Sequence, residues 1–181
     1  MTWSIDNSHS HVGFSIKHMM VATVRGQFHD YSGVMTIDPD NLANSTVTGE
    51  IAVSSIDTRD AKRDEHLKSA DFFNVEAFPT ITYRSTRVEK TGDDTFKVFG
   101  DLTIKDVTKE VALDIEYSGT AKDPWGNTKT GFSATGTINR KDFGLGWNAV
   151  LETGGVLVGE TVKIQLDIEA VVAAPVAAAI A

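Results

Sequence analysis

Several stretches of this chain alternate apolar and polar residues with a period of two, and this pattern limits the folds open to it more than any other feature. The stretch TVKIQLDIEA, residues 161–170, places Val162, Ile164 and Leu166 on one face of an extended chain, with polar side chains opposite. The stretches HVGFSIKH and VALDIEY alternate in the same way. Successive side chains of a β-strand point to opposite faces of a sheet, so each stretch predicts a strand with one buried face.

Turn-forming clusters such as Asp38-Pro39-Asp40-Asn41 and Gly154-Gly155 separate the alternating stretches. They delimit eight predicted strands, at about residues 10–18, 25–37, 46–55, 79–88, 94–104, 109–118, 129–139 and 161–171. Eight antiparallel strands can close into a barrel whose interior fills with side chains or holds one small ligand. We therefore predict an all-β fold, an eight-stranded antiparallel barrel. A sandwich of two sheets would show the same periodicity and is the structural alternative.

The second predicted strand changes parity part-way along its length. Phe28 lies on one face of the extended chain, whereas Tyr31, Met35 and Ile37 lie on the opposite face. A β-bulge near His29-Asp30 would bring all four to the same side, and bulges help sheets to curl.

The segment between the third and fourth predicted strands breaks the alternation and has the composition of a helix. It reads TRDAKRDEHLKSADFF, and its candidate N-cap is Asp57 or Thr58. Asp64 and Lys68 can pair at i,i+4, so we expect the charges of this helix to face water. Neither a catalytic nor a metal-binding role for His66 is favoured, because its acidic neighbours point elsewhere on a helix. We predict a short helix that covers one end of the barrel.

The composition is that of a soluble globular protein and excludes several classes of function. The 181 residues suggest one domain, which we place at 1–171, followed by an Ala-rich tail at 172–181. The net charge of -8 argues against nucleic acid as a partner, because phosphate binding needs clustered Lys and Arg. The chain has no cysteine, which rules out disulfides, thiol catalysis and cysteine-ligated metals.

Neither end of the chain reads as a membrane or export segment. The N-terminal stretch MTWSIDNSHSHVGF lacks the basic and apolar regions of a secretory signal. We expect the protein in the cytoplasm, or in the periplasm if Met1 replaces a signal that has been removed. The C-terminal stretch VVAAPVAAAIA is apolar but far shorter than the ~20 residues of a membrane helix.

A series of short motifs, in order over roughly residues 3–170, carries a resemblance to a known family. They are Asp6-x-x-His9-Ser10, His18-Met19-Met20-Val21, Val24-Arg25-Gly26-x-Phe28, Ser54-Ser55-Ile56-Asp57-Thr58, Arg63-Asp64-x-His66-Leu67, Asp71-Phe72-Phe73, Pro79-Thr80-Ile81, Gly100-Asp101-Leu102-Thr103-Ile104, Gly131-Phe132-Ser133-Ala134 and Asn139-Arg140-x-Asp142-Phe143-Gly144. The chain thus resembles the YceI-like proteins, described as polyisoprenoid-binding, lipocalin-like barrels. Asp106 and Glu110 depart from the usual Gly and Pro of that family, in a turn between strands.

The resemblance implies a long-chain amphipathic lipid, an isoprenoid or fatty lipid, held inside a lipocalin-like barrel. The predicted inward faces are aliphatic and aromatic, which suits a dry, elongated cavity. The residues predicted to contact the ligand are Phe14, Ile16, His18, Phe28, Met35, Ile51, Val53, Phe72, Phe73, Ile81, Leu102, Leu113, Phe132 and Trp147. Transient contact with a membrane and a homodimer are left open as further associations.

The remaining polar candidates favour structural roles over chemistry. His9 and His11 would share one side of a strand, but a third metal ligand is not visible and their face looks outward. His18 shares the inward face with Phe14, where we expect a bond to a backbone carbonyl, or else contact with a lipid headgroup. No G-x-S-x-G motif and no phosphate-binding glycine loop occurs. We therefore predict no catalytic residue, metal or cofactor.

Two other classes of function stay open at this point. One is an enzyme that acts on an isoprenoid or other apolar substrate, with His18 or Asp142 as acid or base. The other is an interaction module whose barrel is filled by its own side chains. Polar side chains that converge on one point of a cavity would favour the first, and the absence of a cavity would favour the second.

Overall fold

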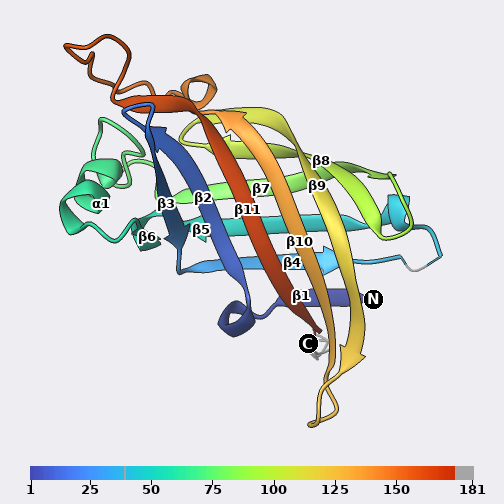
Figure 1. Ribbon diagram of the computed structural model, residues 1–181. Coiled ribbons are helices and arrows are strands. Elements are labelled where there is room, and N and C mark those ends of the chain that lie inside the picture. Colours follow the sequence, from blue (N-terminus) through green and yellow to red (C-terminus); the bar gives the residue numbers. More distant parts are fainter. Residues whose placement is uncertain (39, 174–181) are drawn as a thin grey trace.

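The computed structural model describes residues 1–38 and 40–173 and folds them into one antiparallel sheet wound into a barrel (Figure 1). The strands are β1 (Thr2–Ile5), β2 (His11–His18), β3 (Ala22–Phe28), β4 (Tyr31–Thr36), β5 (Thr46–Ala52), β6 (Ile56–Asp57), β7 (Thr80–Lys90), β8 (Thr95–Ile104), β9 (Val107–Lys122), β10 (Thr128–Asn139) and β11 (Val158–Val172). The described residues also form one α-helix, α1 (Ala61–Lys68). They form four short 3-10 turns, η1 (Asn7–His9), η2 (Leu42–Asn44), η3 (Val53–Ser55) and η4 (Arg140–Phe143).

The sheet closes on itself, which confirms the barrel and excludes the sandwich. Neighbouring strands follow the order β1-β4-β5-β7-β8-β9-β10-β11, and β11 pairs back onto β1. In that closing ladder Trp3 faces Val172 and Ile5 faces Ala170. All pairings around the ring in the described part of the chain are antiparallel. The closed ring consists of eight strands, which is the number that the periodicity predicts.

We call each of the eight strand positions around the barrel a stave. Three staves consist of two consecutive strands, and the others of one strand each. The first stave is β1 followed by β2, the second β3 followed by β4, and the third β5 followed by β6, with η1, His29-Asp30 and η3 at the breaks. At the far end of the barrel β2, β3 and β6 continue the pairing beside β11. The expected change of parity occurs at His29-Asp30, since Phe28 and Tyr31 are both buried, but the chain breaks there into β3 and β4 and does not form a bulge within one strand. The strand β1 lies outside the predicted range 10–18.

Helix α1 lies between β6 and β7 and covers one end of the barrel, as predicted (Figure 1). Its N-cap is Asp60, not Asp57 or Thr58: the Asp60 carboxylate accepts hydrogen bonds from the backbone N–H groups of Lys62 and Arg63, at 3.0 and 3.1 Å. Thr58 is buried instead, and its hydroxyl donates to the carboxylate of Asp64 at 2.5 Å. The predicted pair of Asp64 with Lys68 is therefore not formed.

The first strand and the last strand lie side by side where the sheet closes. Strand β11 runs to Val172, one residue past the predicted domain boundary, and Ala173 N–H donates to the Thr2 carbonyl at 2.9 Å. The rest of the predicted Ala-rich tail lies outside the described residues. Within 1–38 and 40–173, no helix is long and apolar enough to span a membrane.

Candidate ligand cavity

The barrel encloses a cavity of about 890 Å³. Inward side chains of the strands line its wall, and residues of the α1 segment and of the loop after η4 line one end. On β11, for example, Val162, Ile164, Leu166 and Ile168 all face it, in the predicted alternation. A volume in the ~300–1,000 Å³ range is typical of sites for small molecules and cofactors.

Several inward side chains are only partly buried, which shows that the barrel is hollow. Phe14, Ile164 and Ile168 point inward, yet each keeps accessible surface that faces the cavity. In a filled core, such residues would contact neighbours on all sides and lose this surface. The prediction of an interaction module with a filled barrel therefore does not describe this chain.

Most of the predicted ligand contacts lie at the cavity wall. Those found there are Phe14, Ile16, His18, Phe28, Met35, Ile51, Phe72, Phe73, Ile81, Leu102, Leu113, Phe132 and Trp147. The prediction is wrong for Val53, which is only 1% exposed and does not line the cavity. Strand β5 ends at Ala52, and the 3-10 turn η3 that follows abandons the alternation from which Val53 was assigned.

Aromatic rings cover two parts of the wall. Phe28 lies 5.7 Å from Phe14 and 6.4 Å from Phe73, measured between ring centroids, so these three join β2, β3 and the segment after α1. On the far side, the rings of Tyr117 and Phe132 lie 5.4 Å apart on β9 and β10. The edges and faces of these aromatic rings therefore form apolar surface in contact with any ligand in the cavity.

The α1 end of the cavity carries a second aromatic cluster, built around His66. Its ring lies 5.1 Å from Phe72 and 4.7 Å from Trp147, both edge-on, and its Nε2 lies 2.9 Å from the carboxylate of Asp71. His66 and Arg63 both line the cavity. The prediction that the charges of this helix all face water is therefore wrong at these two positions, because the helix turns one polar edge towards the barrel.

Arg140 fixes the loop that carries Trp147, and no pattern in the sequence predicts the contacts that it makes. Its side chain is 2% exposed, and its guanidinium donates only to backbone carbonyls. The acceptors are those of Leu145, Trp147 at 2.9 Å, Val158 at 3.2 Å and Gly159 at 2.7 Å. Burial lowers the pKa of this guanidinium below its ordinary value, and the charge of Glu160 opposes that shift.

Asp142 is not a partner of Arg140, although it lies only two residues away in the sequence. Asp142 is exposed and borders a separate groove of about 590 Å³ on the outside of β9, β10 and β11. His18 lines the cavity, and in the described part of the chain its ring has no hydrogen-bond partner, so the expected bond to a backbone carbonyl is absent. The two residues proposed as acid or base for an enzyme thus lie on opposite sides of the barrel wall.

Two tyrosines inside the barrel also went unassigned. The hydroxyl of Tyr83 donates to the carbonyls of Val98 and Val111, at 3.3 and 3.2 Å, and that of Tyr31 donates to the carbonyl of Ser10 at 2.8 Å. Burial raises the pKa of both phenols above the ordinary value, so both stay protonated at neutral pH. Their alternation with apolar neighbours is the signal that could have placed them at the wall.

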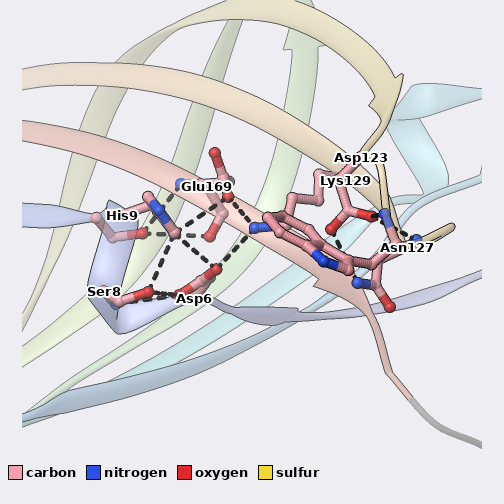
Figure 2. Close-up of polar contacts among 9 residues, drawn as sticks. Asp6, Ser8, His9, Asp123, Asn127, Lys129 and Glu169 are labelled. Atoms are coloured by element: carbon pink, nitrogen blue, oxygen red, sulfur yellow. Dashed lines mark hydrogen bonds and ion pairs between the residues drawn. The ribbon is translucent and has the colours of Figure 1, made fainter.

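A separate polar cluster lies on the surface where η1 meets β11 (Figure 2). His9 Nδ1 lies 3.0 Å from a carboxylate oxygen of Asp6 and 3.5 Å from one of Glu169. These three could surround a cation, but the ammonium group of Lys129 already lies 3.1 Å from Asp6 and 2.6 Å from Glu169. We interpret the cluster as a clamp between the first stave and β10–β11. The predicted absence of a metal stays a prediction.

Hydrogen bonds set the charge state of this clamp. The hydroxyl of Ser8 and the ring of His9 stabilise the carboxylate of Asp6 and hold its pKa far below the usual range. The carboxylates of Glu169 and Asp6 raise the pKa of Lys129. His11, the other half of the predicted histidine pair, is exposed on β2 and is not part of the cluster.

Comparison with known proteins agrees with this geometry. The family model of the YceI-like domain matches residues 3–170. A UPF0312 protein of Staphylococcus aureus strain N315 is 40% identical over 168 residues, which is 92% of this chain and 95% of that protein. The YCEI protein of Campylobacter jejuni superposes with a TM-score of 0.75 at 34% identity, over 93% of this chain and 96% of its own.

Two more distant structures share the fold. BcnA of Burkholderia cenocepacia has a TM-score of 0.80 at 23% identity, over 91% of this chain and 98% of its own. A polyisoprenoid binding domain from Saccharophagus degradans has a TM-score of 0.67 at 15% identity, over 94% and 98%. The match to the family model, the identity to the S. aureus relative and the closed barrel agree: this chain belongs to the YceI-like family.

Proposed function

We propose that the protein holds a long-chain amphipathic lipid, a polyisoprenoid or a similar molecule, inside its barrel and transports or stores it. The observation that carries this proposal is the cavity of about 890 Å³ inside the barrel, with a wall of aliphatic and aromatic side chains. The likeness in fold to a polyisoprenoid binding domain supports it.

The energetics favour a ligand with a long hydrocarbon chain. Burial of such a chain contributes ~0.8 kcal/mol per CH₂, so a sixteen-carbon tail offers on the order of 12 kcal/mol before the costs of association. Small apolar cavities can stay dry, but one of this volume, lined almost wholly by hydrocarbon, would hold water poorly because that water would lack polar partners. A hydrocarbon ligand removes this cost.

The polar end of the ligand would lie towards α1. His18 pairs with Val158 across the β2–β11 ladder, Arg140 donates to the carbonyls of Val158 and Trp147, and the Trp147 ring contacts His66. Basic side chains therefore gather at this end of the cavity. Arg140 has its donors engaged, Arg63 donates to the hydroxyl and carbonyl of Thr58 at 2.8 and 2.6 Å, and the Nε2 of His66 lies against Asp71. His18, whose ring has no partner among the described residues, is therefore the group that could meet a headgroup which accepts hydrogen bonds.

Native mass spectrometry tests the proposal. Purified protein should carry a mass beyond that of the chain, and solvent extraction should release a long-chain lipid. Delipidated protein should then take up a C20 isoprenoid alcohol. Equal native and denatured masses, an empty extract and no uptake of the alcohol would together refute the proposal.

A further inference from the structure

The turn between β2 and β3 has a backbone that does not suit its residues. Val21 N–H donates to the His18 carbonyl at 3.2 Å, and the two central residues, Met19 and Met20, have φ angles of 51° and 63°. The turn lies in a three-residue connection, because His18 pairs with Ala22 across the hairpin. A β-turn with both central residues in the left-handed region is of type I′, which favours Asn-Gly. Methionine is disfavoured there because its Cβ approaches the following carbonyl. Large apolar side chains thus occupy this tip against the local preference.

These side chains project into solvent and belong to a larger exposed apolar surface. Met20 is 68% exposed and Val21 83%, and Val150, in the loop 149–157, is 85% exposed. The hairpin and the loop lie together: Met19 N–H donates to the Leu157 carbonyl at 2.8 Å, and the Met20 sulfur lies against Gly155. Figure 1 shows both at the end of the barrel that α1 covers. We call Met19–Val21 together with the loop 149–157 the apolar tip.

The apolar tip is continuous with the cavity. His18 and Leu157, which flank its two halves, both line the cavity wall, and so does Val158. A molecule that left the cavity beside α1 would meet this surface first. The exposed apolar side chains therefore lie where a lipid would pass between the barrel and its surroundings.

The charges around the tip identify the kind of surface that it fits. Although the chain has a net charge of -8, residues 7–29 contain no Asp or Glu, and Lys17 and Arg25 are exposed on β2 and β3 behind the turn. The acid of the tip itself is Glu152, in the loop 149–157. Exposed apolar side chains beside basic ones match the boundary of a bilayer, where hydrocarbon underlies phosphate groups. A long Lys side chain can extend along apolar groups and keep its ammonium among the phosphates.

We propose that the apolar tip docks on a phospholipid bilayer, inserts Met20, Val21 and Val150 among the lipids, and holds the α1 end of the cavity at the membrane. This inference rests on the proposed function, since the bilayer would be the source or destination of the cavity ligand. Sequence preference agrees with it, because residues that contradict their local structure are typical of functional positions.

Flotation with vesicles tests the docking tip. The probes are vesicles of phosphatidylcholine with about one fifth phosphatidylglycerol, a share chosen to give phosphate charge for Lys17 and Arg25. The double variant Met20→Ser, Val21→Ser should float at least about tenfold less than the wild-type protein, because the inserted apolar area is gone. The control is Trp125→Ser, which removes an exposed aromatic (84% exposed) from the β9–β10 turn at the opposite end. It should float like the wild type.

A second variant separates docking from folding. Met19→Asn, Met20→Gly places the favoured residues in the type I′ turn, so its melting temperature should rise by about 2–6 °C. Its flotation should nevertheless fall, because the methionines are lost. Flotation of either tip variant at the wild-type level, or loss of flotation in Trp125→Ser, would overturn the proposal.

Two further readouts keep the outcomes distinct. Sedimentation of the wild type as a dimer, with both tip variants monomeric, would assign the tip to contact between copies of this chain and overturn membrane docking. Uptake of the C20 isoprenoid alcohol, measured without vesicles, should be equal in all variants. Failure of uptake in the wild type would refute the proposed function, and flotation would still decide whether the tip docks.

Discussion

A carboxylate placed at Phe14 tests the assignment of the inner wall. The Phe14 ring faces the cavity, lies 5.7 Å from the ring of Phe28 and covers the backbone of Gly26 on the neighbouring strand. Phe14→Asp removes these contacts and leaves a carboxyl group in apolar surroundings. The matched control is Phe99→Asp on β8, where the phenyl ring lies on the outer face beneath the guanidinium of Arg87, 3.8 Å away.

The expected loss of stability has two parts. Truncation of a core Phe costs about 3–5 kcal/mol, and the lower value applies because Phe14 borders a cavity. Burial raises the pKa of the new carboxyl group in the folded state, and a rise of about two units costs about 2.7 kcal/mol at pH 7. The sum is about 6 kcal/mol, which corresponds to a fall in melting temperature of about 12–24 °C. Phe99→Asp should cost within about 1 kcal/mol, since an ion pair with Arg87 replaces the cation–π contact.

Thermal unfolding at two pH values and lipid content together form the assay. The folded-state pKa of the introduced carboxyl group lies above its unfolded-state value, so its cost is present at pH 7 and disappears as pH falls below both values. The deficit of Phe14→Asp relative to the wild type should therefore shrink to roughly half near pH 4. Retention of the C20 alcohol should be lost in Phe14→Asp and kept in Phe99→Asp. Unchanged melting and full retention in Phe14→Asp would show that this face of β2 points outward.

Three more predictions concern polar groups that the structure places. Arg140→Met should lower the free energy of unfolding by about 3 kcal/mol or more in urea, because buried carbonyls lose their donor; a change below about 1 kcal/mol would contradict the network. His66→Gln should lower the free energy of unfolding by about 1–2 kcal/mol and alter the fluorescence of Trp147. If neither changes, His66 is a surface residue with no part in the aromatic cluster. Asp6→Asn should cost about 1–2 kcal/mol at pH 7. Because the folded-state pKa of Asp6 is depressed, its contribution is present above the unfolded value of ~3.9 and is lost as pH falls, so the variant should show a flatter acid limb of stability.

The alternation sufficed for the barrel but not for its breaks. All eight staves carry runs of period two that are long enough to be recognised, but the first stave begins with β1, whose four residues are too few to show the pattern and are cut off by η1. Val53 was misplaced for the same reason, because a 3-10 turn shifts parity without any change in composition. Periodicity describes regular strands and carries no information where the backbone leaves them.

Polar groups were harder to predict because their partners are distant or are backbone atoms. The segment before α1 offers three side chains that can cap a helix, and the outcome depends on tertiary contacts: Asp57 bonds His29 at 2.8 Å, and Thr58 is buried against Asp64. Only Asp60 is then left to cap. Arg140 binds carbonyls up to 19 positions away, and carbonyls leave no trace in the residue letters. Asp142, the acid nearest to Arg140 in the sequence, is not among its partners.

The size of the cavity follows from glycines on the inner wall. An eight-stranded barrel is just wide enough for its side chains to fill it, so a large cavity requires that they leave the axis free. A Cβ at Gly26 would lie 2.3 Å from the Phe14 ring, and one at Gly100 would lie 2.4 Å from the Tyr83 ring. Each ring thus occupies space over a neighbouring strand that a side chain at the glycine would take. The hydroxyl of Tyr83 is also tied to wall carbonyls, which holds its ring away from the axis. Aromatic side chains that pointed towards the axis would fill the barrel. Here they lie against the wall over the glycines, and this arrangement leaves the space that we assign to a lipid.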